Sequence, residues 1–216
     1  KLERMGNPPA RQAELRNRWG SALWEVGRLE EAHAKFSEAL KLRESIYGEA
    51  HTITASTAAN RAIALTELGR FAEAQQIFEK YLAIQDALLP KDDPQRLRVL
   101  APLGYTLHAL EDWEALLPVV EQLLSLRGAE LRQDAQVYAA HAWKAFALQG
   151  QGKTEAARAS LARSLALAQA RHEPADPRMA APWMYVGEFS LRGGAPRDAV
   201  AELEKARALI PVTDEV

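Results

Sequence analysis

Apolar and polar residues are spaced along the chain as they are in helices. From about residue 17 onward, apolar residues recur at intervals of three and four, which places them on one face of an α-helix. No segment alternates residue by residue, as a half-exposed strand does. The clearest stretches predict helices at residues 17–26, 55–68, 97–110, 136–149 and 182–191. The pattern therefore predicts an all-α protein.

A short block of residues recurs five times at a nearly constant distance. Its copies start 41 or 42 residues apart, at Gly27, Gly69, Glu111, Gly152 and Gly194. A small residue lies seven positions before each start: Gly20, Ala62, Gly104, Ala145 and Gly187. A fixed period of this length indicates a helical repeat. One helix pair cannot bury both of its faces, so we expect successive pairs to stack.

Each repeat is predicted to be two helices joined by a tight turn. Gly27, Gly69 and Gly152 directly follow helical stretches, where a left-handed C-terminal cap favours glycine. Nine positions after each block start there is a large apolar residue: Phe36, Phe78, Val120, Leu161 and Leu203. These residues are the predicted core of the second helix. The small residue before the block marks the place where two helices approach closely.

These motifs resemble the tetratricopeptide repeat. The first copy carries its pattern at Gly20, Leu23, Gly27, Leu29, Ala32, Phe36 and Ala39. The common version of that repeat has about 34 residues. The longer period here is similar to that of kinesin light chains and many bacterial regulatory proteins.

The resemblance implies a right-handed α-solenoid of five helix-turn-helix repeats over residues 13–210. The expected repeats span about 13–54, 55–96, 97–137, 138–179 and 180–210. Residues 1–12 match the phase of a preceding repeat and its loop, so we expect the native chain to continue upstream. Residues 211–216 form the expected C-terminal tail.

Composition removes several classes of function. The 27 Lys and Arg nearly balance the 29 Asp and Glu, which gives no broad attraction toward nucleic acid or an anionic membrane. No apolar run approaches the roughly 18 residues of a membrane span. The chain has no cysteine, which excludes disulfides and thiolate sites and fits a reducing compartment. We therefore expect a cytoplasmic protein that binds neither nucleic acid nor membranes.

One stretch, residues 147–154, resembles a phosphate-binding loop because it ends in Gly152-Lys153-Thr154. Such a loop needs a strand that leads into a helix, whereas here a helix precedes it. We interpret the stretch as the turn of the fourth repeat. The five histidines lack the spacing of metal ligands, and no serine lies in a nucleophile elbow. The sequence thus predicts no enzyme, no cofactor and no metal.

The resemblance implies a non-catalytic module that binds a peptide or partner protein along a concave groove. In the family, the first helix of each pair lines that groove. Transferring those positions copy by copy gives the candidate partner-binding residues: Asn17, Ser21, Trp24, Asn60, Ile63, Arg98, Tyr105, His108, Trp143, Phe146 and Tyr185.

Several interpretations stay open at this point. Asn60 would either grip a peptide backbone, as the resemblance implies, or tie two helices together. The aromatic candidates would either face a partner or pack between helices, and Trp19 is assigned to packing. The whole chain could also be a sensory or regulatory segment of a larger bacterial protein, such as a Ser/Thr kinase or transcription regulator. A third possibility is a scaffold that self-associates through an exposed terminal helix.

Overall fold

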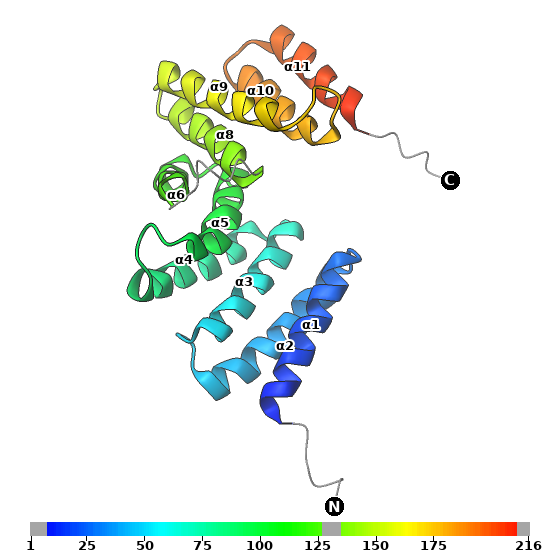
Figure 1. Cartoon of the computed structure of the whole chain (residues 1–216), viewed down its shortest axis with the longest axis vertical. Helices are drawn as coiled ribbons and strands as arrows, with labels where there is room; N and C mark the ends of the chain where they lie inside the picture. The colour runs from blue at the N-terminus through cyan, green and yellow to red at the C-terminus, as the bar shows by residue number, and fades with distance from the viewer. Residues whose placement is uncertain (1–7, 127–134, 211–216) are drawn as a thin grey trace, which may run out of the picture. The chain divides into compact units, whose positions relative to one another are not determined.

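The computed structural model describes residues 8–126 and 135–210, which are almost entirely helical (Figure 1). These residues contain ten α-helices, two short 3-10 helices and no strand, which confirms the all-α prediction. Of the segment 1–12 expected to belong to a preceding repeat and its loop, residues 1–7 lie outside the described residues, as do residues 211–216, whereas residues 9–12 belong to the first helix. The helices are α1 (Pro9–Glu25), α2 (Leu29–Tyr47), α3 (Thr52–Glu67), α4 (Phe71–Leu88), α5 (Leu97–Ala109), α6 (Trp113–Ser125), α8 (Ala135–Gly150), α9 (Thr154–Arg171), α10 (Ala180–Arg192) and α11 (Pro196–Leu209), with 3-10 helices at Pro94–Arg96 and Pro177–Met179.

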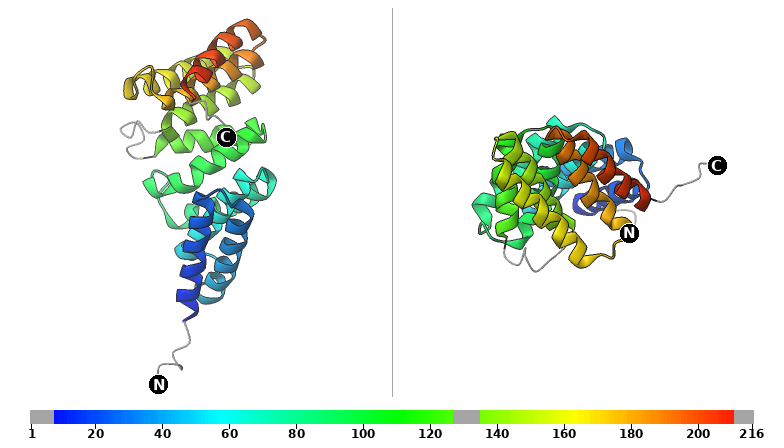
Figure 2. Two further views of the ribbon diagram at one scale, coloured as in Figure 1. Left: turned by 90° about the vertical axis from the view of Figure 1, so that its right-hand side faces the viewer. Right: turned by 90° about the horizontal axis from the view of Figure 1, so that it is seen from above.

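Successive helices pack as antiparallel pairs, each of which is one repeat (Figure 1 and Figure 2). The chain divides into two compact units, Lys1–Pro90 and Lys91–Val216. The first unit contains α1 to α4, and the second contains α5 to α11. Within each unit the second helix of one pair packs on the first helix of the next pair, as α2 does on α3 and α6 on α8.

The same backbone hydrogen bond closes the turn in all five pairs. In the first turn the amide of Arg28 donates to the carbonyl of Leu23 at 2.9 Å, and Gly27 adopts a positive φ of 74°. Equivalent bonds follow α3, α5, α8 and α10. The third turn places Glu111 at the glycine position with a φ of 56°, a conformation that residues with a side chain rarely adopt. The predicted left-handed caps are confirmed.

The small residues sit where the two helices of a pair approach closely. A Cβ added to Gly20 would lie 2.8 Å from the ring of Phe36, and one added to Gly187 would lie 2.6 Å from Leu203 Cγ. Both distances are below contact distance. Glycine at these positions therefore makes room for the bulky core residue of the second helix, as the repeat pattern predicted.

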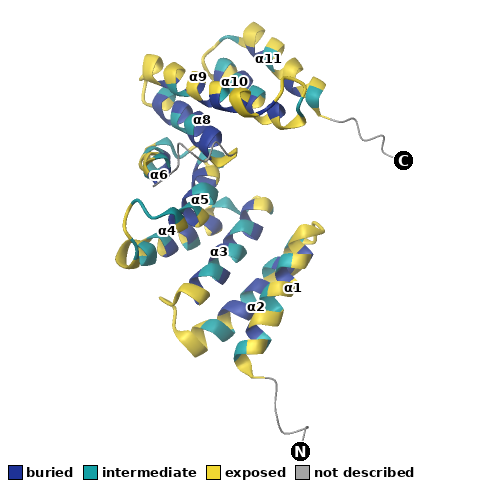
Figure 3. Cartoon of the chain, in the orientation of Figure 1, coloured by how far each residue is buried: buried dark blue, intermediate teal, exposed yellow. Residues whose placement is uncertain are grey.

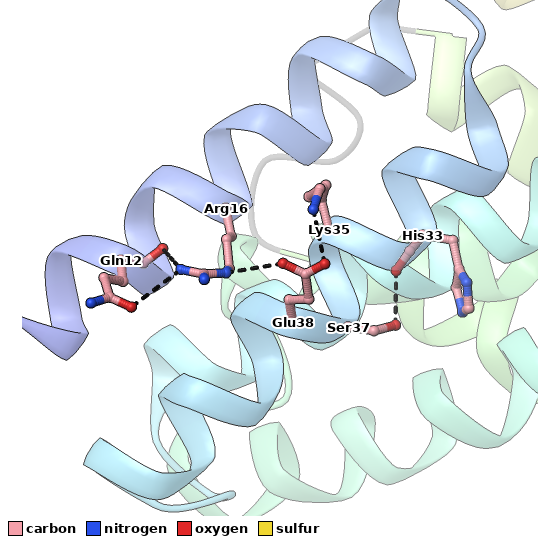
Figure 4. A network of polar contacts seen from close by, with 6 residues as sticks. All are labelled: Gln12, Arg16, His33, Lys35, Ser37 and Glu38. Carbon is pink, nitrogen blue, oxygen red and sulfur yellow. Dashed lines mark hydrogen bonds and ion pairs between the residues drawn. The ribbon is translucent and has the colours of Figure 1, made fainter.

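Polar contacts also tie α1 to α2 (Figure 4). Arg16 Nε donates to Glu38 Oε2 at 3.0 Å, and Lys35 Nζ donates to the other oxygen of the same carboxylate at 2.8 Å. Arg16 also reaches the carbonyl of Gln12. Only the Arg16–Glu38 pair joins the two helices, since Lys35 and Glu38 both lie on α2, and an exposed pair of this kind contributes little to stability.

The core of each unit follows the repeat. In the first unit Leu23, Phe36 and Ala64 belong to one buried cluster. The second unit has a larger core, and α8 is its most completely buried helix (Figure 3).

Three helices begin earlier than the expected repeat starts at residues 13, 55 and 138. Helix α1 begins at Pro9 because the fixed φ of proline suits the first position of a helix. Helix α3 begins at Thr52 because the preceding His51 side chain caps it by accepting a hydrogen bond from the amide of Ile53.

Replacing Gly20 by leucine should destabilise the first unit by about 1–3 kcal/mol, because the added side chain overpacks the contact with Phe36. The measurement is urea unfolding followed by circular dichroism. Ala34→Leu is the matched control, since Ala34 is exposed on α2 and its substitution should change the free energy of unfolding by less than about 0.5 kcal/mol. Equal effects of the two substitutions would contradict the proposed close contact.

Candidate functional site

A groove between α1 and α3 brings five of the predicted residues together. Its apolar part is a pocket of about 190 Å³ lined by Ser21, Trp24, Glu25, Phe36, Asn60 and Ile63. These residues come from the first helices of two successive repeats, with Phe36 forming the floor from α2. Trp24 is 36% exposed, so its indole borders the opening. This arrangement agrees with the prediction that the candidate residues of the first two repeats lie on one surface.

An amide pair crosses the groove at one end of this pocket. Asn60 Nδ2 donates to Asn17 Oδ1 at 3.3 Å, and both side chains are half-buried. The hydroxyl of Ser21 donates to the carbonyl of Asn17 at 3.2 Å. Asn60 thus ties α1 to α3, one of the two roles open from the sequence. The bond uses one donor of Asn60 and one acceptor of Asn17, so Asn60 Oδ1 and Asn17 Nδ2 are not used by it.

A second, more polar hollow of about 490 Å³ lies beyond the amide pair, and sequence reasoning missed it. Its lining includes Arg11, Glu14 and Asn17 from α1, Arg43 and Tyr47 from α2, and Ile53 from α3. Arg43 donates to the carbonyl of Ile53 at 3.1 Å and to the hydroxyl of Thr57. The signal was weak because Arg43 and Tyr47 belong to a second helix, whereas the family resemblance directs attention to first helices.

In the second unit two other candidates, Phe146 and Tyr185, lie beside His108. Its ring lies 4.8 Å from that of Phe146 and 6.5 Å from that of Tyr185. His108 Nε2 is 3.7 Å from Glu188 Oε1. These contacts join α5, α8 and α10. Burial raises the pKa of Tyr185 to about 12, so this phenol stays protonated at neutral pH.

Arg192 lies over the rings of Trp113 and Phe146 and forms two ion pairs there. It donates to Glu111 at 2.6 Å and to Glu188 at 3.1 Å, and its guanidinium lies 5.1 Å from the ring centre of Trp113. The hydrogen bond from Arg192 lowers the pKa of Glu111. Side chains of the unit itself therefore fill this part of the face. The pairing of Glu111 with Arg192 could not be read from the sequence, since 81 residues separate them.

The structure corrects two of the predicted partner-binding residues. Trp143 is 5% exposed and Phe146 is 1% exposed, so both are core residues of the second unit with little surface to offer a partner. The periodicity of α8 did not reveal this because the helix is buried on most sides. Tyr105 is 47% exposed beside Trp143, and Arg98 is exposed at the start of α5.

The resemblance to a phosphate-binding loop is explained by the turn between α8 and α9. Here the amide of Gly152 donates to the carbonyl of Gln149, and that of Lys153 to the carbonyl of Leu148, each at 2.9 Å. Both amides are turned inward and used by the turn, so they cannot cradle a phosphate. The interpretation as a repeat turn is confirmed. Among the described residues, no group of three or more acidic or histidine side chains is placed to hold a metal ion.

Comparison with known proteins agrees with this architecture. A family model described as tetratricopeptide repeat matches residues 11–87. These residues are tetratricopeptide repeats. No curated protein matches the chain in sequence.

Solved structures extend the tetratricopeptide-repeat fold over nearly the whole chain. A putative kinesin light chain repeat protein from Podosopora anserina is 20% identical with a TM-score of 0.72, over 98% of this chain and 100% of its own. MamA from Desulfovibrio magneticus RS-1 is 18% identical with a TM-score of 0.63, over 94% and 98%. YrrB is 20% identical with a TM-score of 0.54, over 92% and 86%. The predicted long, kinesin-light-chain-like form of the repeat is confirmed.

Within the part of the chain that the structure describes, no helix is both long enough and apolar enough to cross a bilayer.

The environment of His108 predicts a pH-dependent stability. Burial lowers its pKa, and Arg192 adds to this, whereas Glu188 and Glu111 oppose it. The unfolded chain therefore binds the proton more readily than the folded one. This contribution to stability is present above the ordinary histidine pKa of 6.5 and is lost as pH falls below it.

Replacing His108 by glutamine should therefore reduce the loss of stability on acidification. The measurement is urea unfolding of both proteins at about pH 7.5 and about pH 5. We expect the free energy of unfolding to fall less between these pH values in the variant than in the wild type. An equal fall in both would show that His108 takes up its proton as readily in the folded protein as in the unfolded chain.

Proposed function

We propose that this chain is a non-catalytic protein-interaction module that binds a peptide or a segment of a partner protein in the groove between α1 and α3. The observation that carries the proposal is the convergence of five predicted positions from two repeats on one groove. Such a groove, built on packed helices, is largely formed before binding and loses little conformational entropy when it is filled.

The two hollows and the amide pair suggest how a peptide would be held. The apolar pocket beside Trp24 and Ile63 is of a size to take one apolar side chain. Asn60 Oδ1 could accept from a peptide amide and Asn17 Nδ2 could donate to a peptide carbonyl, which would grip the backbone whatever its sequence. The polar hollow that contains Arg11 and Arg43 would then meet polar side chains.

The first unit is favoured over the second as the primary binding surface. In the second unit Arg192 lies over Trp113 and Phe146, and a ligand would have to displace its ion pairs. Tyr105, Arg98 and Tyr185 stay predicted contacts of secondary importance. YrrB is described as a tetratricopeptide-repeat protein with an unusual peptide-binding site, and this analogy of fold supports the same type of function here.

The wider biological setting is part of the proposal and rests on the sequence. A role as a sensory or regulatory segment of a larger bacterial protein would use the same groove, with the partner supplied by another part of the system. A cytoplasmic location is expected from the lack of cysteine. Neither nucleic acid nor a membrane is a proposed partner.

Peptides selected from a random display library on the immobilised chain provide the test. Their dissociation constants would be measured by fluorescence anisotropy for wild type and for Trp24→Ala, Ile63→Ala and Asn60→Ala. We expect losses of about tenfold or more for Trp24→Ala, because aromatic anchors dominate interfaces, and smaller losses for Asn60→Ala.

Leu88→Ala is the matched control, because Leu88 is an apolar residue of α4 that is 55% exposed outside the groove. Circular dichroism would establish that every variant keeps its helical fold. Selected peptides that bind wild type and Trp24→Ala equally well would contradict the proposed groove. Failure to select any peptide would contradict peptide binding itself.

A further inference from the structure

A cavity of about 260 Å³ lies in the first unit between α2, α3 and α4. Its wall includes the buried side chains of Leu40, Ala55 and Tyr81. Glu49 and Lys80, both exposed, line its mouth and form an ion pair with each other. A protein cavity of about 150 Å³ takes up benzene, so this volume suits a molecule of about ten non-hydrogen atoms.

The cavity is separate from the peptide groove, although α3 contributes to both. Thr54, Ala58 and Arg61 line the cavity, whereas Asn60 and Ile63 line the apolar pocket of the groove. With 3.6 residues in each turn of a helix, these two sets point in nearly opposite directions from α3. A molecule in the cavity therefore does not compete with a peptide in the groove.

The last repeat explains why the second repeat is hollow at this place. The positions equivalent to Thr54 and Ala58 lie 125 residues later and are Met179 and Trp183. Met179 is 1% exposed, and Trp183 packs against the same core cluster. Both have larger side chains than their equivalents in the second repeat. The cavity thus corresponds to space that a methionine and an indole fill in the last repeat.

A lysine lies at equivalent positions beside the filled space and the hollow one. In the last repeat Lys205 Nζ lies 4.3 Å from the ring centre of Trp183. Its equivalent in the second repeat is Lys80, at the mouth of the cavity. An ammonium group is attracted to the face of an aromatic ring. The last repeat therefore indicates that an aromatic ring is the group that suits this cavity.

The wall of the cavity also carries a buried hydroxyl. Thr54 is 1% exposed, and its Oγ1 has no hydrogen-bond partner among the described residues. A threonine inside a helix can donate to the carbonyl four residues earlier, as Thr66 does to Ala62 at 3.0 Å. Thr54 is the third residue of α3, so the residue four positions earlier lies outside the helix. Because an unpaired buried hydroxyl is unfavourable, Thr54 favours a ligand that can hydrogen-bond to it.

We propose that this cavity is a second binding site, which takes a small uncharged aromatic molecule with one N–H or O–H group. The ring fills the space beside Ala58, next to the ammonium of Lys80, and the polar group pairs with Thr54 Oγ1. A net charge on the molecule is unfavourable because the wall is largely apolar and Lys80 is already paired with Glu49. Indole and simple phenols belong to this class.

Indole and indene test the proposal on the full chain, because indene has the same two fused rings without the N–H. Binding would be followed through the backbone amide signals in NMR spectra during a titration. We expect saturable binding of indole with a dissociation constant of about 1 mM or below, and weaker binding of indene. The signals that shift should belong mainly to residues 54–61 and 76–84. Indole that saturates none of these signals would overturn the proposal.

Three variants separate the hydroxyl from the space. Thr54→Val keeps the shape of the side chain and should weaken indole binding about three- to tenfold while leaving indene binding unchanged. Ala58→Trp gives the second repeat the residue of the last repeat and should abolish binding of both molecules by filling the cavity. Thr66→Val is the matched control, because Thr66 is a buried threonine of α3 outside the cavity and its substitution should leave indole binding unchanged. Circular dichroism would establish that each variant stays helical.

Equal affinity of wild type and Thr54→Val for indole would overturn the role of the hydroxyl. Indole binding that survives Ala58→Trp would overturn the site. Thr54→Met, which copies Met179, is a second filling variant with the same expected loss in case Ala58→Trp does not fold.

Two further measurements separate this site from protein binding. N-acetyltryptophanamide carries the same ring on a peptide backbone, and tighter binding of it than of indole would overturn the proposal by assigning the cavity to a side chain of a partner protein. Trp24→Ala, which alters the peptide groove, should leave indole binding unchanged. The peptide site and the aromatic site can therefore fail independently.

Discussion

The close approach of the two helices in each pair is the constraint on which the rest of the structure depends. It requires a residue with little or no side chain opposite a bulky one, as at Gly20 against Phe36 and Gly187 against Leu203. This contact and the turn together set how the two helices of a pair pack, and this packing determines which faces of the first helix remain for other contacts. In α1 one face carries Asn17 and the groove, and another exposes Leu15 and Trp19, so Trp19 is not the packing residue that the sequence predicted.

Much of the fold could be predicted because it is repeated. A single small residue or glycine says little, but the same small residue seven positions before the same turn in five copies specifies a helix pair. The backbone bond that closes each turn needs no particular side chain. For this reason Ser190 replaces leucine in the last copy, and Glu111 replaces glycine in the third, without loss of the turn.

The site was predictable only in part, because the repeat specifies positions and leaves side-chain partners open. It placed Ser21, Trp24, Asn60 and Ile63 on one pocket. It could not show that α8 is buried on most sides, which makes Trp143 and Phe146 core residues. Nor could it show the amide pair of Asn17 and Asn60, since such contacts depend on rotamers and on the local angle between helices.

The ion pair between Glu111 and Arg192 has a consequence for how the second unit unfolds. In an ideal solenoid each repeat touches only its immediate neighbours, so the last repeat can fray by itself. Arg192 instead links the last repeat to the turn of the third, past α8, while it stacks on Trp113. This link couples two repeats that are not adjacent. Unfolding of the end of the chain is thereby made more cooperative than a nearest-neighbour stack allows.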